Sequence, residues 1–364
     1  SMIPSKPAPW HRMALTGAAL VAILAAGAVF HSLLAHGVFN SVESGFAGQC
    51  RVVASPAGPE DIALDPVSKM AILSATDRRA LKNGKPSKAD GLYAYAYGVA
   101  GARPVKLSGT PANFHPHGIS LYRGADGKLT LYVINHPYKA QNAVVTFGVT
   151  IADGKVQLNE TGFIGSDLLK SPNAIAAVDE ARFYVVNDHT VSSDAGRWMD
   201  DNLSLPRADA LYFDSTKFAV AANRLNFPNG IVVSADGRFV YIAEKFARRI
   251  VAFERDPFLG RLKNVGELAI PANLDNLRLG DDGALWVSGT PKAYALSDYR
   301  HDPAKVAPSV VYRVSLQDGL PTAFEQIFAD SGAHISGSSV GASANGHLLI
   351  GSAFDTKIMD CSTR

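Results

Sequence analysis

Short runs of apolar residues, each introduced by a polar turn, recur along most of the chain. Six such runs cover residues 69–73, 126–133, 181–186, 236–242, 282–287 and 345–350, and four of them begin with Asp-Gly or Asn-Gly. These dipeptides favour tight hairpin turns, because both central residues need positive φ, and the aromatic and β-branched residues around them suit strands. The pattern predicts β-hairpins throughout the chain.

A second element, a polar pair followed by an aliphatic residue, precedes each of these turns. The pairs occupy positions 60–61, 117–118, 173–174, 229–230, 275–276 and 338–339, at intervals of 46 to 63 residues. A repeat of roughly this length that contains two hairpins is typical of a four-stranded propeller blade. We therefore expect an all-β fold, a six-bladed β-propeller.

Radial repetition would bring the six polar positions to one end of the central channel. The predicted ring consists of Glu60, His117, Asn173, Asn229, Asp275 and Ser338. A simpler interpretation of each position alone is that polar residues at strand starts bond to the local backbone.

The ring, together with one neighbouring residue, provides two carboxylates and three amides. These ligands are Glu60, Asn173, Asn229, Asp275 and Asn276. Such an oxygen set suits calcium better than magnesium or zinc. Bound calcium would act as a Lewis acid on a carbonyl group.

Histidines near this ring are candidates for a general base. His117 belongs to the ring, and His136 follows the apolar run of the second repeat. Imidazole titrates near neutral pH and can take a proton from an attacking water. His115 and His189 are possible substitutes, and structural roles remain open for all four. One Gly-x-Ser-x-Gly match occurs, at residues 337–341. It coincides with the sixth polar pair, at the start of a predicted strand, rather than with the strand-to-helix turn that an α/β-hydrolase serine nucleophile requires.

The N-terminal segment predicts a single hydrophobic helix over residues 13–39. Residues 13–42 contain no Asp, Glu, Lys or Arg, and about 20 apolar residues suffice to cross a bilayer. Lys6 and Arg12 precede the segment, so residues 1–12 are expected in the cytoplasm and the domain at 40–364 on the exoplasmic side. The alternative is a signal peptide cleaved near residues 26–28. Ser1 before Met2 is interpreted as an expression scar.

Composition and cysteine placement narrow the class further. The chain has 364 residues, 19% charged and 47% hydrophobic, and a net charge of +2 without basic runs, so nucleic acid is not an expected partner. Its two cysteines, Cys50 and Cys361, lie at the two ends of the predicted domain. They are either two unrelated buried thiols or a disulfide that closes the propeller, and a disulfide would require an oxidising compartment. Gly17 and Gly27 would permit helix–helix association, a weak indication of an oligomer.

From Cys50 to Cys361 the chain resembles the paraoxonase family of lactonases and arylesterases. The segments behind the resemblance are residues 58–61, 114–120, 132–137, 184–189, 228–231, 240–244, 274–276 and 285–287. The order and spacing of these segments, rather than any one of them, make it specific.

The resemblance implies roles for individual residues. It implies a catalytic calcium on the five ligands above, a dyad of His117 and His136, and an Asp188 that lies close to the dyad and orients His136. It also implies a second, structural calcium at Asp61 and the carbonyl of Ile119. An acidic third ligand is replaced here by Ala174, so we expect that second ion to be absent, weakly bound or otherwise ligated.

The expected function is calcium-dependent hydrolysis of lactones and aryl esters. The hydrophobic helix favours lipophilic substrates, although residues 288–291 lack a histidine that the family often has there. The alternatives are a sugar lactonase of the gluconolactonase and regucalcin type, and a non-catalytic calcium-stabilised propeller that binds a partner protein. The stretch 188–206, with Trp198 and Met199, would be either a lid or an interaction surface.

Overall fold

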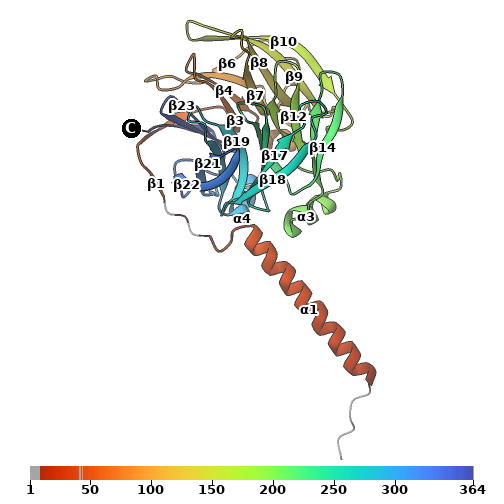
Figure 1. Cartoon of the computed structure of the whole chain (residues 1–364). Coiled ribbons are helices and arrows are strands. Elements are labelled where there is room, and N and C mark those ends of the chain that lie inside the picture. The colour runs from red at the N-terminus through yellow and green to blue at the C-terminus, as the bar shows by residue number, and fades with distance from the viewer. Residues whose placement is uncertain (1–8, 41, 43, 364) are drawn as a thin grey trace, which may run out of the picture.

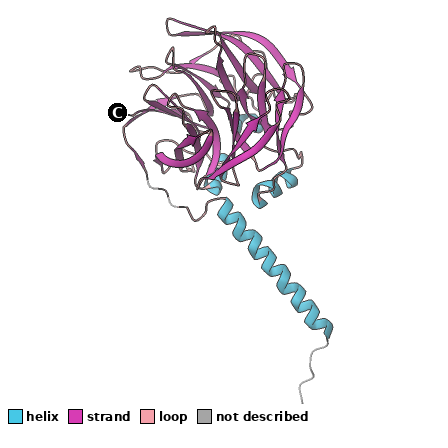
Figure 2. Ribbon diagram, in the orientation of Figure 1, coloured by secondary structure: helices cyan, strands magenta, loops and turns pink. Residues whose placement is uncertain are grey.

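A computed structural model describes residues 9–40, 42 and 44–363. The described residues form six antiparallel sheets, gathered in one strand-rich body from which a long helix projects (Figures 1 and 2). This arrangement confirms the predicted propeller. The first two blades consist of β3 (Pro59–Asp65), β4 (Met70–Ala75), β5 (Gly91–Ala96) and β6 (Val105–Lys106), and of β7 (Pro116–Arg123), β8 (Leu129–Asn135), β9 (Ala143–Ala152) and β10 (Lys155–Gly165). The next two consist of β11 (Pro172–Ala177), β12 (Phe183–Asn187), β13 (Ala208–Phe213) and β14 (Phe218–Leu225), and of β15 (Pro228–Val233), β16 (Phe239–Glu244), β17 (Arg249–Arg255) and β18 (Leu262–Ala269).

The last two blades recruit strands from the N-terminal part of the chain. The fifth consists of β19 (Asn273–Leu279), β20 (Leu285–Thr290), β21 (Ser309–Gln317), β22 (Leu320–Asp330) and the short β1 (Gly45–Phe46). The sixth consists of β23 (Ser338–Ala344), β24 (His347–Ser352), β25 (Lys357–Ser362) and β2 (Gln49–Ala54). Because β2 completes the blade built by the C-terminal strands, the two ends of the propeller are joined by backbone hydrogen bonds.

The predicted disulfide reinforces this closure. Cys50 on β2 and Cys361 on β25 are directly opposite each other and are bonded, 311 residues apart in sequence. In the chain-entropy model, a disulfide that closes a loop of this size stabilises the folded state by about 6 kcal/mol.

The hydrophobic core is divided among the blades. Each junction between neighbouring blades holds its own cluster of buried apolar side chains. Between the fourth and fifth blades, for example, Tyr241 and Ile250 pack with Leu274 and Val287. Apolar residues on both faces of the inner strands are therefore buried, as the continuous apolar runs predict.

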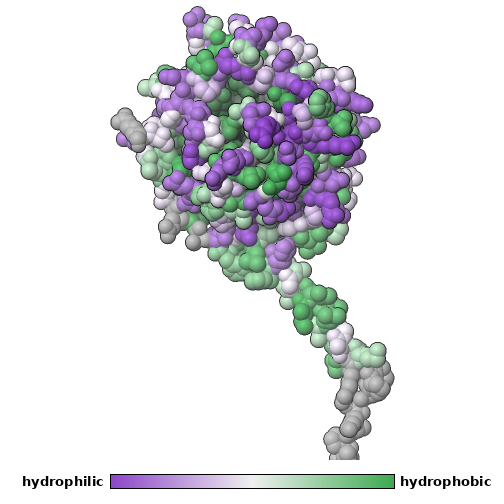
Figure 3. Space-filling view, viewed as in Figure 1, coloured by the Kyte–Doolittle hydropathy of each residue, from purple (hydrophilic) through white to green (hydrophobic). Residues whose placement is uncertain are grey.

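The hydrophobic helix α1 (Pro9–Ala35) projects from the propeller and presents an apolar surface to solvent (Figure 3). The helix begins four residues before the predicted segment 13–39, its apolar span starts at Met13 as predicted, and it ends at Ala35, four residues early. The helix ends because Gly37 has φ +66°, and the amide of Val38 bonds back to the carbonyl of Leu33, a Schellman-type end. Residues 1–8 of the predicted cytoplasmic tail lie outside the described residues.

The end of α1 is bonded to the propeller. The ring of His36 stacks on that of Tyr294 at 4.2 Å, and the carbonyl of His36 accepts a hydrogen bond from the amide of Ala293. Asn40 donates to the carbonyls of Pro271 and Pro291. These contacts place the end of α1 beside helix α4 (Ala293–His301). Two further helices, α2 (Arg78–Lys82) and α3 (Asp194–Leu203), lie in loops.

Candidate active site

A break in strand register occurs in all six inner strands at the predicted polar positions. Glu60 on β3, Asn173 on β11 and Asn229 on β15 each fall between two paired residues and have no partner on the next strand. The same break falls at residues 117–118, 275–276 and 339 on β7, β19 and β23. A β-bulge redirects a side chain, and here each bulge lies at the same end of its strand. The predicted ring is therefore present, with Ser339 rather than Ser338 in register.

The inner strands approach one another closely at these bulges, and glycine makes this possible. A Cβ atom on Gly118 would lie 2.4 Å from the carbonyl oxygen of Asn173, and one on Gly230 would lie 2.5 Å from that of Asp275. The glycines that follow His117 and Asn229 thus bring polar residues of neighbouring blades together.

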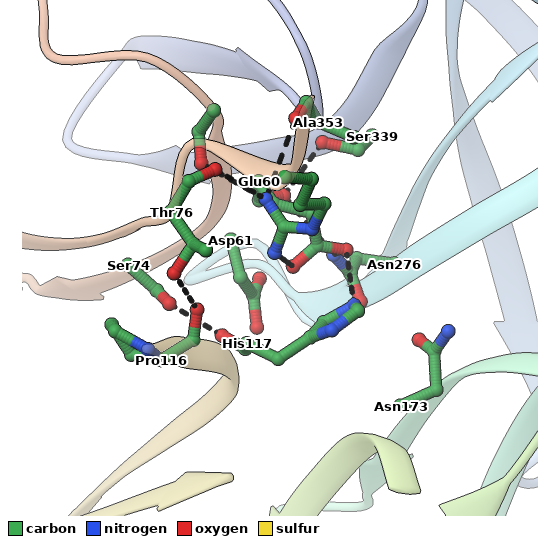
Figure 4. A network of polar contacts seen from close by, with 12 residues as sticks. Glu60, Asp61, Ser74, Thr76, Pro116, His117, Asn173, Asn276, Ser339 and Ala353 are labelled. Atoms are coloured by element: carbon green, nitrogen blue, oxygen red, sulfur yellow. Dashed lines mark hydrogen bonds and ion pairs between the residues drawn. The ribbon is translucent and has the colours of Figure 1, made fainter. Parts of the chain in front are cut away.

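Glu60 is the centre of the polar network shown in Figure 4. The residue is 2% exposed, and its Oε1 accepts a hydrogen bond from the Asn276 amide at 2.7 Å. The imidazole of His117 lies 3.6 Å from the same oxygen, and Arg78 lies 4.0 Å from Oε2. The Ser339 hydroxyl donates to the Glu60 carbonyl. Burial opposes ionisation of Glu60, but the charges of His117 and Arg78 outweigh it and lower its pKa.

All three predicted amide ligands direct their nitrogen towards an acceptor of the protein. Asn173 donates to Asp188, Asn229 to the carbonyl of Leu274, and Asn276 to Glu60. These partners can only accept, so the amide orientation is fixed. The carbonyl oxygens of the three side chains are thereby left for another donor or for a cation.

Three oxygens of this set are buried without any hydrogen-bond partner in the described structure. They are Oε2 of Glu60, Oδ1 of Asn173 and Oδ1 of Asp275. Burial and the charge of Glu60 raise the pKa of Asp275 well above its usual range. Buried acceptors without donors are unfavourable, and a hard cation would satisfy all three. No group of three or more His, Cys, Asp or Glu in the described residues is arranged to hold a metal, so an ion here depends on the amides as well.

The two predicted catalytic histidines lie beside each other. The rings of His117 and His136 are 5.1 Å apart, edge to face. Nδ1 of His136 lies 2.9 Å from Oδ1 of Asn142, whose own amide nitrogen donates to the carbonyl of Leu169. His136 therefore carries its proton on Nδ1. Burial, followed by the charge of His117, lowers its pKa to about 4, so His136 is neutral at physiological pH.

Asp188 does not form the expected hydrogen bond to His136, which binds Asn142 instead. Its carboxylate accepts hydrogen bonds from Ser171, Asn173 and His189. Burial opposes its ionisation, but the contacts with His189, Ser171 and Asn173 together lower its pKa strongly. Asp188 thus orients the predicted calcium ligand Asn173 directly.

The stretch 188–206 contains α3, which borders the site. His189 bridges Asp188 and Asp201 of α3, and these bonds outweigh burial and raise its pKa to about 9. His115 likewise bonds to Asp90 at 2.7 Å and to Asn113. Both rings of the two possible substitute bases, His189 and His115, are therefore held by hydrogen bonds within the protein. The position of α3 favours the lid interpretation of this stretch.

A pocket of about 560 Å³ opens at this end of the channel. Glu60, His117, Asn173, Asn229 and Asp275 line its floor, and α2, α3 and α4 supply side chains to its walls. Arg78 and Lys245 also line it, and sequence reasoning missed both. Lys245 directly follows segment 240–244, which carries part of the family resemblance. This adjacency could have indicated that Lys245 lies at the site.

The second predicted metal position is occupied by an arginine. Nη2 of Arg278 lies 2.6 Å from Oδ1 of Asp61 and donates to the carbonyl of Ile119 at 2.9 Å. These are the two ligands that the resemblance implies for a structural calcium, and Ala174, 3% exposed, adds no carboxylate. Although burial raises the pKa of Asp61 to about 6, the charge of Arg278 opposes this shift.

The fold and the site define a class of proteins, six-bladed β-propellers with a polar pocket at one end of the channel. The chain belongs to the arylesterase family, because the family model described as Arylesterase matches residues 79–362. The family predicted from the sequence is thus confirmed.

Individual relatives support this assignment. The human serum paraoxonase/arylesterase 2 (Homo sapiens) is 31% identical over 245 residues, 67% of each chain. The bovine protein of the same name (Bos taurus) is 28% identical over 322 residues, 86% of this chain and 89% of the relative. A solved luciferin-regenerating enzyme is 12% identical with a TM-score of 0.54, covers 86% of this chain and 95% of its own, and shows the fold alone.

Replacing Arg278 by methionine should destabilise the propeller by about 3 kcal/mol at pH 7, because Asp61 would remain buried without its cation. Urea denaturation measures the difference. The matched control is Arg261→Met at an exposed position, which should stay within about 0.5 kcal/mol of the wild type. Equal stability of the Arg278 variant and the control would contradict a structural role for this ion pair.

Proposed function

We propose that the protein hydrolyses esters and lactones with a single calcium ion at the pocket floor. The observation behind this proposal is the set of three buried oxygens without partners, on Glu60, Asn173 and Asp275. Membership of the arylesterase family supports a hydrolase of the esterase or lactonase kind.

The ion would be held by Glu60, Asn173, Asn229, Asp275 and Asn276. Calcium accepts six to eight oxygen ligands, so five protein ligands leave positions for water and substrate. Bound there, calcium would polarise the substrate carbonyl and stabilise the negative charge that develops on its oxygen.

The two histidines would carry out the proton transfers. In this proposal His117 accepts a proton from the attacking water, whose oxygen bonds to the carbonyl carbon, and returns a proton to the departing oxygen as the ester or lactone C–O bond breaks. The neutral ring of His136, fixed by Asn142 at 2.9 Å, orients His117 and accommodates its charge. The 3.6 Å approach of Glu60 to His117 favours the protonated state that forms.

One calcium ion per chain is the proposed stoichiometry. The guanidinium of Arg278 already provides a positive charge to Asp61 and a donor to Ile119, so those groups have no need of a second ion. In this proposal the guanidinium of Arg278 takes the place of the structural calcium.

The proposed location is a membrane, with α1 as a single-pass anchor. Met13–Ala35 comprises 23 apolar-rich residues, most of them exposed, with Ala35 buried where the helix meets the propeller, and it spans about 34 Å as a helix. That length suits a bilayer core of about 30 Å, and the disulfide is consistent with the exoplasmic side. Because the helix ends beside α4, which lines the pocket, the pocket would open near the bilayer.

Calcium removal tests the metal. The purified protein should contain about one calcium ion per chain, and treatment with a chelator should lower turnover of phenyl acetate and δ-valerolactone by at least about 100-fold, reversibly. Glu60→Gln should reduce both calcium content and activity. Glu325→Gln, an exposed position on β22, is the control and should change neither. Full turnover by the calcium-free protein would disprove the role of the metal.

Replacing His117 by glutamine tests the base. We expect a loss of about 10²–10⁴ in kcat for ester hydrolysis, because proton transfer from water is lost, with calcium content retained. The control is His334→Gln, whose side chain is 66% exposed. If the His117 variant turned over at the wild-type rate, His117 would not be the base.

Membrane fractionation tests the anchor. The full chain should stay with membranes through washes with high salt and alkaline carbonate, because about 20 apolar residues leave the bilayer only in detergent. Deletion of residues 1–39 should release a folded, active propeller into the soluble fraction. Recovery of the full chain in the wash would refute membrane insertion.

A further inference from the structure

The pocket is lined by more positive than negative side chains, and most of the positive ones have no carboxylate partner. Its basic residues are Arg78, Arg79, Lys82, Arg197, Lys245 and Arg300. Within the described residues, only Arg78 of these six lies within ion-pair distance of a carboxylate, at 4.0 Å from Glu60. Arg79 is held by the carbonyls of Tyr299, Arg300 and Phe354, which leave its charge uncompensated.

The acidic residues of the pocket are mostly engaged elsewhere. Asp188 accepts hydrogen bonds from three side chains, and Asp201 pairs with His189 at 2.8 Å. Glu60 and Asp275 belong to the proposed calcium site. Asp194, in the first turn of α3, is the remaining carboxylate of the lining. Five basic residues without a carboxylate partner outnumber it, so the open part of the pocket is electropositive, and a bound cation would make it more so.

Lys245 is the most unusual of the basic residues. It is 7% exposed, and its ammonium group lies over the rings of Phe227 and Phe246 at 4.6 and 5.2 Å. No hydrogen-bond acceptor contacts this ammonium group in the described part of the chain, although the residue lines the pocket. Burial lowers the pKa of Lys245, and the carboxylates of Asp275, Asp201 and Asp188 oppose this shift from beyond ion-pair distance. An anionic ligand in the pocket would give the ammonium group the direct ion pair that the described residues do not provide.

Arg300 extends the same surface at the rim. It lies on α4, is exposed, and its guanidinium packs over the ring of Phe354 at 5.4 Å. Apolar side chains lie between these charges, namely Trp198, Phe227, Leu296 and Phe354. The pocket thus combines an apolar wall with fixed positive charges.

We infer that the preferred substrate is an anionic ester or lactone, whose apolar body carries a carboxylate that Lys245 and Arg300 bind. This inference rests on the proposed function and specifies its substrate class. The carboxylate lies towards α4 while the reacting carbonyl lies at Glu60 and Asp275. A purely lipophilic substrate would leave the ammonium of Lys245 without an ion-pair partner.

A matched pair of aryl acetates tests this inference. The pair is 4-acetoxybenzoate, which carries a carboxylate, and 4-isopropylphenyl acetate, a neutral compound of similar shape. The readout is the ratio of their kcat/KM values, measured with calcium present on the wild type and on Lys245→Met, Arg300→Gln and Lys263→Met. Lys263 is exposed on β18, outside the pocket, and controls for the change in net charge.

We expect the ratio to favour the carboxylate in the wild type and to fall about tenfold or more in Lys245→Met, the size of a lost charge-assisted hydrogen bond. It should fall less in Arg300→Gln and stay unchanged in Lys263→Met. If Lys245→Met does not fold, the exposed Arg300→Gln decides the question. An equal ratio in all four proteins overturns this inference alone, whereas failure of the wild type to hydrolyse either ester overturns the proposed function as well.

Discussion

The bulge at the same end of each inner strand is the feature on which the site depends. In a regular antiparallel ladder, Glu60, Asn173 and Asn229 would pair with the neighbouring strand of their own blade. Because the register breaks there, their side chains turn towards the channel, where residues of different blades meet. The glycines beside His117 and Asn229 let the backbones come close enough for this. Closure of the ring by β2 and the Cys50–Cys361 bond fixes the positions of all six strands.

The neighbouring carboxylates of Glu60 and Asp61 on β3 point in different directions and have different electrostatic surroundings. Glu60 faces the pocket, with an oxygen that no donor satisfies, whereas its neighbour Asp61 is paired with Arg278. One carboxylate thus keeps an oxygen without a hydrogen-bond partner at the pocket, and the other is paired with a guanidinium of the chain itself. The same division explains how the chain accommodates Ala174 where the resemblance implies an acid, because a guanidinium needs fewer anionic partners than a divalent ion does.

Much of the fold and part of the site followed from the sequence. Six repeats with a polar pair at a fixed place predict both the propeller and the common location of Glu60, Asn173, Asn229 and Asp275, because radial repetition turns equal positions into neighbours. The cysteines at both ends of the domain likewise indicated the closure, although a disulfide was one of two interpretations.

The remaining features depend on contacts between blades that no repeat encodes. Arg278 reaches Asp61 from another blade, and Asn142 rather than Asp188 bonds to His136. The helix α3 interrupts a stretch that has no repeat pattern. The sequence shows that Lys245 is positively charged. Its ammonium group points into the pocket because it packs over the rings of Phe227 and Phe246, which the sequence does not show.

The most direct test of the central claim is a crystal structure of the calcium-loaded protein with anomalous diffraction. We expect one strong calcium peak at the pocket floor, bonded to oxygens of Glu60, Asn173, Asn229, Asp275 and Asn276. Arg278 should remain on Asp61, with no second peak there. Calcium bound between Asp61 and Ile119, or an occupied pocket floor whose ligands exclude Glu60 and Asp275, would contradict the central claim.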